Sequence, residues 1–369
     1  MDIEIYDRNL NGLDILEKKQ SVYCGIQYDG VGKFEIYAPA SKKTCDLLQK
    51  GNLVYNPYCP NQMGVVKNLQ IKSTSGEGNY IAASGTMSNG LLQNRLTEMK
   101  QFSGNVQDTM IEYVRSVCMN PNSLYYNSII DIGNLDGSIT EELEGSSEYT
   151  DLAELVGSLC SSFGLGYQLR PDLNQRKLLF ECYRGVDRSM NQMENPQMIF
   201  SNEYENVESF EYNYSENNAA NVIVTYTNSG FQREIFVYNP LNVSGGDIIA
   251  RSIRCEPQYI MSIDPDTEET QRTYSKTLTL AKMRQTAMAA FVAPIENFKG
   301  VCNQIALNSF GIDWDLGDIV TFREKDWGKE ISQRVCEVGI ISDETSPFYV
   351  KPVFGSREFT LAELFKKKG

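Results

Sequence analysis

The sequence predicts an α+β fold that is mainly β. It would contain two related β-barrel (tube-like) modules, an inserted small α+β domain and one additional helix. Three observations lead to this prediction. Short β-rich runs separated by turn residues fill both ends of the chain, apolar residues recur at helical spacing between about residues 101 and 166, and a glycine-centred motif near residue 51 reappears near residue 317.

The first β-barrel module is expected over residues 1–100. The run IEIYD is followed by SVYCGIQYDGVGKFEIYAP, in which two β-rich stretches flank Tyr28-Asp29-Gly30 and predict a hairpin. GNLVYNP, MGVVKNLQI and NYIAASG follow, with turn residues such as SGEG between them. Short strands at this spacing are typical of a barrel or a sandwich.

The α+β domain is expected over residues 101–200. Apolar residues from Val106 to Cys118 fall on one helical face, with Asn105 as a candidate cap. A second helix from Leu152 to Phe163 would be capped by Ser147 or Thr150 and end at Gly164. YQLRPDLNQRKLLFECY then predicts a strand, a turn at Pro171-Asp172 and another strand.

The second β module is expected over residues 201–369. Strands are predicted in SFEYNY, NVIVTYTN and REIFVYN, and a long helix over about 273–292, where no Gly or Pro interrupts the chain. VCNQIALNS, DIVTF, RVCEVGII and FYVKPVF complete the strands. The end, FTLAELFKKKG, is a short amphipathic tail that would either fray or dock on a neighbour.

The two modules share a turn motif. Lys50-Gly51-Asn52-Leu53-Val54 and Leu316-Gly317-Asp318-Ile319-Val320 both place glycine, then Asn or Asp, then an aliphatic pair. Glycine supplies the turn, Asn or Asp can bond the local backbone, and the aliphatic pair starts a strand. This pattern indicates two copies of one β module.

The match continues downstream of the turn. A strand begins at Val65-Val66 and the next one ends at Gly85, while the later pair begins at Val335-Cys336 and ends at Gly355, with Ile71 and Ile341 in step. Three such chains would present six quasi-equivalent modules around one axis, which suits an adaptor between a sixfold and a threefold object.

Composition excludes several kinds of chemistry. The chain has no histidine, so Ser-His-Asp and Cys-His hydrolases and histidine-based zinc sites are ruled out. A net charge of −14 disfavours a grip on nucleic acid phosphates. The nine cysteines lie outside any CxxC spacing and are odd in number, which favours free thiols in a reducing cytoplasm. The N-terminus lacks signal-peptide features, and no apolar run is long enough for a membrane helix.

The stretch GIDWDLGDIVTF holds the first candidate site. Asp313, Asp315 and Asp318 imitate the start of a calcium loop, and Glu324 falls at its twelfth position. However, the fifth position is Gly317, and positions 7 to 10, Ile-Val-Thr-Phe, are typical of a strand rather than a loop. We therefore favour a turn that feeds a strand over a metal or acid/base site.

Three further stretches can each be interpreted as a functional site or as an ordinary structural element. The run Tyr183-Arg184-Gly185-Val186-Asp187-Arg188 could hold a catalytic Asp, but we favour a strand end in which Asp187 pairs with Arg184 or Arg188, with a subunit contact as a further possibility. Ser244-Gly245-Gly246-Asp247 lacks the Lys-Ser/Thr of a phosphate loop and is predicted to be a turn. The acids from Glu141 to Glu144 predict a surface loop. No catalytic, metal-binding or cofactor-binding residue is assigned, and no cofactor is expected.

The chain resembles a known family over roughly residues 1–355. IEIYDRNLNGLDIL, KFEIYAP, LLQKGNLV, the run from Tyr183 to Arg188, MIFSNEYENVESFEYNYS, AANVIVTY, LGDIV and VKPVFG carry the resemblance through their order and spacing. The chain is similar to siphovirus-type phage tail proteins. These are related in fold to the contractile-phage baseplate hub and to the N-terminal part of tail-associated (Tal) proteins.

The resemblance implies a structural role at the virion tail tip. A trimeric pseudo-sixfold ring would continue the tail tube, serve as a platform and let DNA pass without binding it specifically. Expected partners are a distal tail protein or tail tube protein, the tape measure protein and other tail-tip or receptor-binding proteins, all assembled in the host cytoplasm without membrane insertion. Because the chain stops shortly after VKPVFG, a lysin or fibre domain is expected on another protein.

Two other classes of function stay open. A tail-associated glycosidase could work with paired carboxylates and without histidine. A receptor-binding or carbohydrate-binding module would fit the β and tyrosine content. We favour the structural, non-enzymatic role over both.

Overall fold

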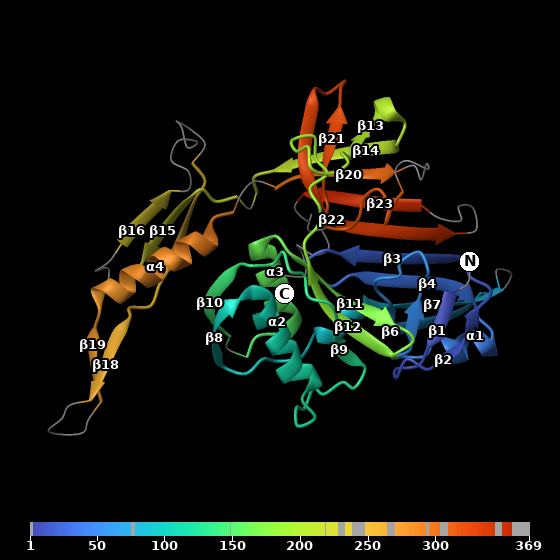
Figure 1. Cartoon of the computed structure of the whole chain (residues 1–369), viewed down its shortest axis with the longest axis horizontal. Helices are drawn as coiled ribbons and strands as arrows, with labels where there is room; N and C mark the ends of the chain where they lie inside the picture. The colour runs from blue at the N-terminus through green and yellow to red at the C-terminus, as the bar shows by residue number, and fades with distance from the viewer. Residues whose placement is uncertain are drawn as a thin grey trace. The chain divides into compact units, whose positions relative to one another are not determined.

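The computed structural model describes residues 3–74, 78–147, 149–217, 219–227, 233–237, 248–263, 270–292, 295–302, 309–343 and 349–355. The chain divides into two compact units. The first comprises Met1–Glu211 and Phe298–Arg357, and the second Tyr212–Asn297 and Glu358–Gly369. Strands outnumber helices among the elements, so the chain is α+β and mainly β (Figure 1). None of the helices in the described residues is both long and apolar enough for a membrane span.

The N-terminal strands form one half of a large sheet. They are β1 (Ile3–Tyr6), β2 (Gly12–Leu16), β3 (Ser21–Gln27), β4 (Lys33–Pro39), β5 (Leu53–Tyr55), β6 (Gly64–Thr74) and β7 (Gly78–Met87). Helix α1 (Lys42–Leu47) lies between β4 and β5 in the chain, and a short 3-10 helix, Ser88–Leu92, follows β7. The hairpin predicted around Tyr28 is the β3–β4 pair, in which Ser21 lies opposite Tyr37.

The C-terminal strands continue the same sheet. They are β13 (Ile199–Ser201), β14 (Val207–Ser215), β20 (Ile295–Cys302), β21 (Ile319–Glu324), β22 (Lys329–Asp343) and β23 (Tyr349–Gly355). The strand order is β14-β20-β23-β22-β3-β4-β7-β6-β5-β1-β2, and β21 joins β22 to β13 beside this path. Among the described residues the path is open, from β14 to β2, and does not close into a barrel.

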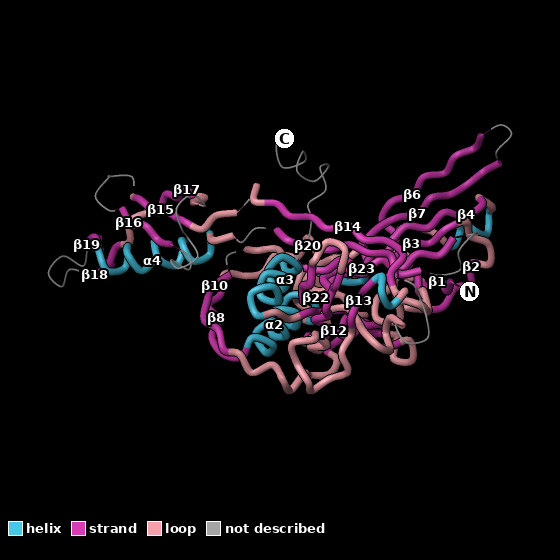
Figure 2. Tube along the Cα trace, turned by 90° about the horizontal axis from the view of Figure 1, so that it is seen from above, coloured by secondary structure: helices cyan, strands magenta, loops and turns pink. Residues whose placement is uncertain are grey.

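The antiparallel contact between β22 and β3 joins the two halves. Glu337 lies opposite Gln27, and the register continues without a break to Asp343 opposite Ser21. At the centre, Ile340 pairs with Cys24 and both are almost fully buried. Figure 1 shows β22, β3 and β4 in succession, and in Figure 2 the β6–β7 hairpin extends beyond its neighbours.

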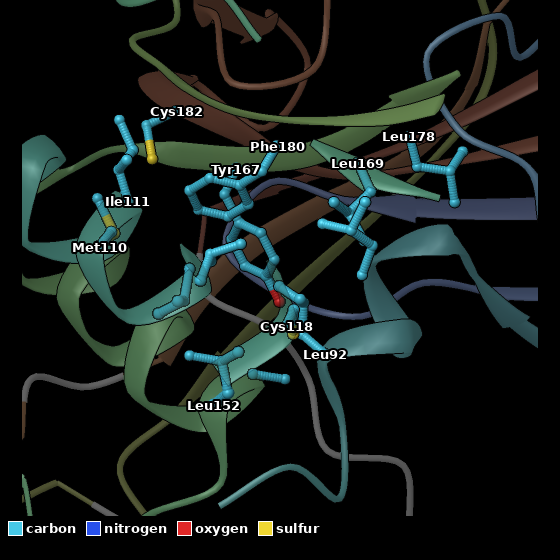
Figure 3. Packing of buried hydrophobic residues seen from close by; sticks show 14 of the residues in the cluster. Leu92, Met110, Ile111, Cys118, Leu152, Tyr167, Leu169, Leu178, Phe180 and Cys182 are labelled. Atoms are coloured by element: carbon cyan, nitrogen blue, oxygen red, sulfur yellow. The ribbon is translucent and has the colours of Figure 1, made fainter. Parts of the chain in front are cut away.

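A group of short strands and helices between the two halves of the sheet in the sequence completes the first unit. Its elements are β8 (Lys100–Asn105), α2 (Val106–Val114), a π-helical turn (Arg115–Met119), β9 (Ile130–Ile132), β10 (Glu142–Ser147), α3 (Leu152–Phe163), β11 (Gly166–Asp172) and β12 (Lys177–Tyr183). Asn105 caps α2 as predicted, and Gly164 ends α3 in the left-handed conformation. In the core, Met110 of α2 contacts Cys160 of α3, with 3.7 Å between the sulfurs. The same cluster holds Tyr167 of β11 and Phe180 of β12, whose ring centroids are 6.3 Å apart (Figure 3).

The second unit holds a small sheet covered by a helix. Strand β15 (Val222–Tyr226) pairs antiparallel with β16 (Arg233–Val237) and parallel with β17 (Ala250–Arg254). Helix α4 (Lys276–Ala290) buries Ala287 against Ile223 of β15, and Ser275 caps its start. Strands β18 (Tyr259–Ile263) and β19 (Thr270–Tyr274) form a separate hairpin.

Several predicted details are wrong by a few residues. Helix α3 is capped by Asp151 rather than by Ser147 or Thr150, because the Asp151 carboxylate accepts from the Ala153 and Glu154 amides. The turn between β11 and β12 lies at residues 173–176, since Pro171 and Asp172 still pair as strand.

Two further predicted elements differ in extent or kind. Helix α4 starts at Lys276, because the residues before Ser275 belong to β19. The acidic run is not a loop, since Glu142 starts strand β10 opposite Asn105 of β8. The predicted turn at Ser244–Asp247 and the C-terminal tail lie outside the described residues.

Candidate functional site

The Gly317-Asp318 turn is the best-defined polar junction of the first unit. Gly317 has a φ of 95°, and β21 begins directly after Asp318. The turn is fastened to β22, because Gly317 N donates to Val335 O (2.9 Å) and Val335 N donates to Asp318 O (2.8 Å). The predicted turn that launches a strand is therefore present.

The Asp318 carboxylate connects this turn to the run from Tyr183 to Arg188. It is only 3% exposed, and its Oδ1 accepts from Val186 N at 2.7 Å. Its Oδ2 accepts from Arg188 Nε at 2.8 Å and from Asp315 N at 3.0 Å. Because its oxygens already hold three donors, Asp318 is arranged to join segments rather than to accept a proton from a substrate.

The predicted pairing of Asp187 with an arginine is wrong. Its Oδ1 accepts from Ser189 N at 2.8 Å, which is a local turn contact. Arg184 instead pairs with Glu141 at 2.5 Å, and Arg188 pairs with Asp318. The sequence places Asp187 between two guanidiniums, but both side chains reach partners that are far away along the chain.

A tyrosine packs against the same turn from the other half of the sheet. The Tyr28 hydroxyl accepts from Gly185 N at 3.0 Å and lies 3.2 Å from Gly164 O, the end of α3. The Arg334 guanidinium lies over the Tyr28 ring, 5.0 Å from its centroid, and donates to Gly317 O at 2.6 Å. Tyr28 thus contacts three elements, and burial raises its pKa.

Two glycines allow this close packing. A Cβ on Gly317 would lie 2.1 Å from the Tyr28 ring, and one on Gly185 would lie 1.9 Å from Gly317 O. Contacts this short are far inside van der Waals distance, so another residue type would have to displace the Tyr28 ring at Gly317 and the backbone at Gly185. The junction therefore requires glycine at both positions.

The turn near residue 51 has the same backbone arrangement. Gly51 has a φ of 89°, its N donates to Val66 O at 2.8 Å, and Val66 N donates to Asn52 O at 3.0 Å. The Asn52 side chain bonds locally, to Leu47 O at 2.8 Å, whereas Asp318 bonds Arg188. The backbone repeats, while the polar side chain serves a different partner in each copy.

The repeat is real in the hydrogen bonds but shifted by one residue from the sequence alignment. Val66, not Val65, holds the place of Val335, since each bonds the glycine turn and each precedes a break in register at Lys67 or Cys336. The two consecutive valines hide this shift in the sequence.

The shift also changes the later matches. Val66 lies opposite Gly85, and Val335 lies opposite Phe354 rather than Gly355. Ile71 opposite Ile81 therefore corresponds to Ile340 opposite Val350, and not to Ile341.

The other acids of the supposed calcium loop point to separate partners. Asp313 accepts from Ser309 N at 2.8 Å, and Glu324 accepts from Asn202 Nδ2 at 2.6 Å. In the part of the chain that the structure describes, no group of three or more His, Cys, Asp or Glu side chains is placed to hold a metal ion. Asp313 and Asp318 instead accept hydrogen bonds from backbone amides and so stabilise the turn.

Asp315 is the acid of this region that borders a hollow. A cavity of about 510 Å³ is lined by Asp315, Tyr58, Cys59 and Phe310, among others. Burial is the main cause that raises the Asp315 pKa, and the nearby Asp318 adds to the effect. Cys59 also lies close to Cys24, and both are buried free thiols.

The comparisons place the chain in a family. A family model described as "Siphovirus ReqiPepy6 Gp37-like protein" matches residues 2–356. The chain belongs to this family. The resemblance to siphovirus-type tail proteins is confirmed, whereas a comparison with the curated proteins gives no significant match.

Solved structures show the same fold at low sequence identity. A tail protein from Neisseria meningitidis MC58 is 10% identical over 96% of each chain, with a TM-score of 0.59. The prophage MuSo2 43 kDa tail protein from Shewanella oneidensis is 11% identical over 97% of this chain and 98% of that chain, with a TM-score of 0.58. Prophage tail protein gp18 from Listeria monocytogenes EGD-e is 13% identical over both whole chains, with a TM-score of 0.55.

Sequence reasoning missed Tyr28 and Arg334 as members of the junction. Tyr28 was assigned only to a hairpin turn, and Arg334 precedes a predicted strand. The two are 306 positions apart. The glycines at 185 and 317, each beside a charged or acidic residue, were the available signal for a close approach of two backbones.

Proposed function

We propose that this protein is a baseplate hub or tail-tip component of a phage tail, which assembles as a homotrimer into a pseudo-sixfold ring that continues the tail tube. One observation carries the proposal. The strand order β3-β4-β7-β6-β5 of the first half is matched by β14-β20-β23-β22-β21 of the second half, and each half holds the same glycine turn.

Two modules in one chain have a geometric consequence. Three chains supply six similar modules, so a threefold assembly can face a sixfold tube with six near-equivalent contacts. We extend the proposal to the division of the chain into a tube-like module at residues 1–100, an α+β domain at 101–200 and a second module at 201–369. The α+β domain would then lie outside or below the ring and offer surface for other tail components.

The charge of the chain fits a passage for DNA. With a net charge of −14, the protein repels phosphates at long range, so DNA would cross the ring without sticking. The role is non-enzymatic, and the partners would be a distal tail or tail tube protein, the tape measure protein and receptor-binding proteins. The fold shared with a tail protein from Neisseria and with prophage tail proteins from Shewanella and Listeria supports this place in the virion.

The proposal is tested by the mass and shape of the purified full-length chain. Light scattering over a range of concentrations should approach three times the chain mass of 41.7 kDa, and electron micrographs should show rings with a central hole. A chain that stays monomeric at high concentration and in the presence of its tail neighbours would overturn the proposal.

A further inference from the structure

The outer half of strand β6 is a sheet edge. Strand β5 covers only its start, where Val54 lies opposite Gly64 and Leu53 opposite Val65. From Asn68 to Thr74, β7 is the only strand beside β6 among the described residues. An uncovered edge of this length is a template for pairing with another chain.

The backbone direction along this edge follows from β7. Met87 N donates to Gly32 O, on the β4 side, so alternate residues of β7 point toward β4 and those between them point toward β6. Ser84, Ala82 and Tyr80 therefore bond their β6 partners, which are Asn68, Gln70 and Lys72. The N–H and C=O groups of the intervening residues Leu69, Ile71 and Ser73 point outward.

The repeat shows what these outward positions do when a strand covers them. With Val66 matched to Val335, the residues Leu69, Ile71 and Ser73 correspond to Val338, Ile340 and Ser342 of β22. Those three pair with Ile26, Cys24 and Val22 of β3. In the second half of the sheet, the segment of β22 that corresponds to residues 68–74 of β6 is therefore paired with β3 along its whole length.

The side chains make the same contrast. Val338 is 0% and Ile340 is 1% exposed, whereas Leu69 is 43% and Ile71 is 59% exposed. The first half therefore keeps apolar residues at two positions that are buried in the second half. Isoleucine and leucine on a solvent-exposed edge are typical of an interaction surface rather than of a bare strand.

The strand that fits this edge is β14, a terminal strand of the sheet. Strand β14 (Val207–Ser215) ends the strand order, and it has the place in the second half that β3 has in the first. Within one chain, β22 already pairs with β3, its counterpart across the junction of the halves. The equivalent contact between chains pairs β6 with β14.

We propose that the β6 edge from Asn68 to Thr74 pairs with strand β14 of a second copy of this chain. This inference rests on the proposed ring and names the strands that close it. The contact is head-to-tail, because β6 of one copy meets β14 of the next, and such contacts generate a closed ring when the rotation returns to the start.

The first test weakens the edge without disturbing the fold. The double variant Leu69→Lys with Ile71→Lys places two charges on the edge, and Ile71→Pro removes one outward N–H that has no bond to β7. Leu124→Lys is the matched control, since Leu124 is 90% exposed and belongs to another element. Light scattering should show the edge variants as monomers and the control as the wild-type assembly, all with the same circular dichroism spectrum.

The outcomes separate the two proposals. Wild-type protein that never assembles overturns the ring, and the pairing with it. Wild-type protein that assembles, with edge variants that assemble equally well, overturns the pairing of β6 alone and leaves the ring intact.

A second test identifies the partner strand. Ile71→Cys is combined in turn with cysteine replacements of Glu211, Tyr212, Asn213 and Tyr214, and the assembled protein is mildly oxidised. Cross-linked dimers and trimers on a denaturing gel are expected for the pair in register, and not for Ile71→Cys alone or for Leu124→Cys with the same replacements. An assembled protein in which no pair cross-links would rule out β14 as the occupant.

Discussion

At the scale of single residues, the junction separates two neighbouring acids by their surroundings. Asp318 is bonded by Arg188 and two amides, whereas Asp315 accepts only from Leu316 N among the donors found for its side chain in the described residues. Burial raises the Asp315 pKa, so its ionised form opposes folding. Burial of the ionised Asp315 carboxylate therefore lowers the free energy of unfolding, and the other contacts of the junction must outweigh this loss.

We therefore expect Asp315→Asn to stabilise the protein at neutral pH. A carboxyl whose folded pKa is raised binds its proton more tightly in the folded state, so its contribution to stability falls as pH rises between the unfolded and folded pKa. The gain from Asp315→Asn should be larger at about pH 7 than at about pH 4, the ordinary pKa of an aspartate. Urea unfolding at both pH values measures it. An equal gain at both would mean that the carboxylate charge is not the cause.

Glu181 supplies a control with the opposite sign. Its burial alone would raise its pKa, but hydrogen bonds from Arg170 and Gln168 outweigh this, and the pKa is lowered. Its charged form therefore stabilises the fold above the unfolded pKa, and that contribution is lost as pH falls. Glu181→Gln should accordingly destabilise at about pH 7, and its effect should shrink as pH falls through the lowered folded pKa and both states become protonated.

At the scale of elements, the glycine turn fixes where β21 begins and how it approaches the rest of the sheet. The sequence was sufficient to predict this turn, since glycine, an acid and an aliphatic pair are a local pattern. It was not sufficient for the register, because the irregularity at Lys67 and at Cys336 follows from pairing across strands. The contact between Tyr28 and Arg334 could not be predicted for the same reason, because it joins segments that are distant in the sequence.

Replacement of Gly317 by alanine tests the turn. Gly311 and Gly317 both have positive φ, but a Cβ on Gly311 meets nothing within 4 Å, whereas one on Gly317 meets the Tyr28 ring. Gly311→Ala should cost about 1–2 kcal/mol of unfolding free energy from the backbone alone. Gly317→Ala adds the clash and should cost about 3–5 kcal/mol. Equal losses for the two variants in denaturant titrations would show that the contact with Tyr28 adds nothing.

At the scale of the whole molecule, the chain is asymmetric in which edges it covers. One contact between the two halves is made within the chain, by β22 and β3, and it buries apolar residues of both strands. The matching edge on β6 and the terminal strand β14 lie at other positions of the strand order. The hydrophobic pattern of β6 marks it as a strand in the sequence, but nothing local distinguishes a strand that awaits another chain from one that pairs within its own.

If that edge is covered only on assembly, thermal stability depends on protein concentration. Only folded chains associate with one another, so dilution should lower the midpoint of thermal unfolding by mass action. Leu69→Lys with Ile71→Lys should remove this dependence, and Leu124→Lys should keep it, since only the former alters the β6 edge. Differential scanning fluorimetry over a hundredfold range of concentration measures the slope. A midpoint that does not move with concentration in the wild-type chain would contradict assembly, and a slope that survives in the β6 variant would assign the stabilising contact to a different surface.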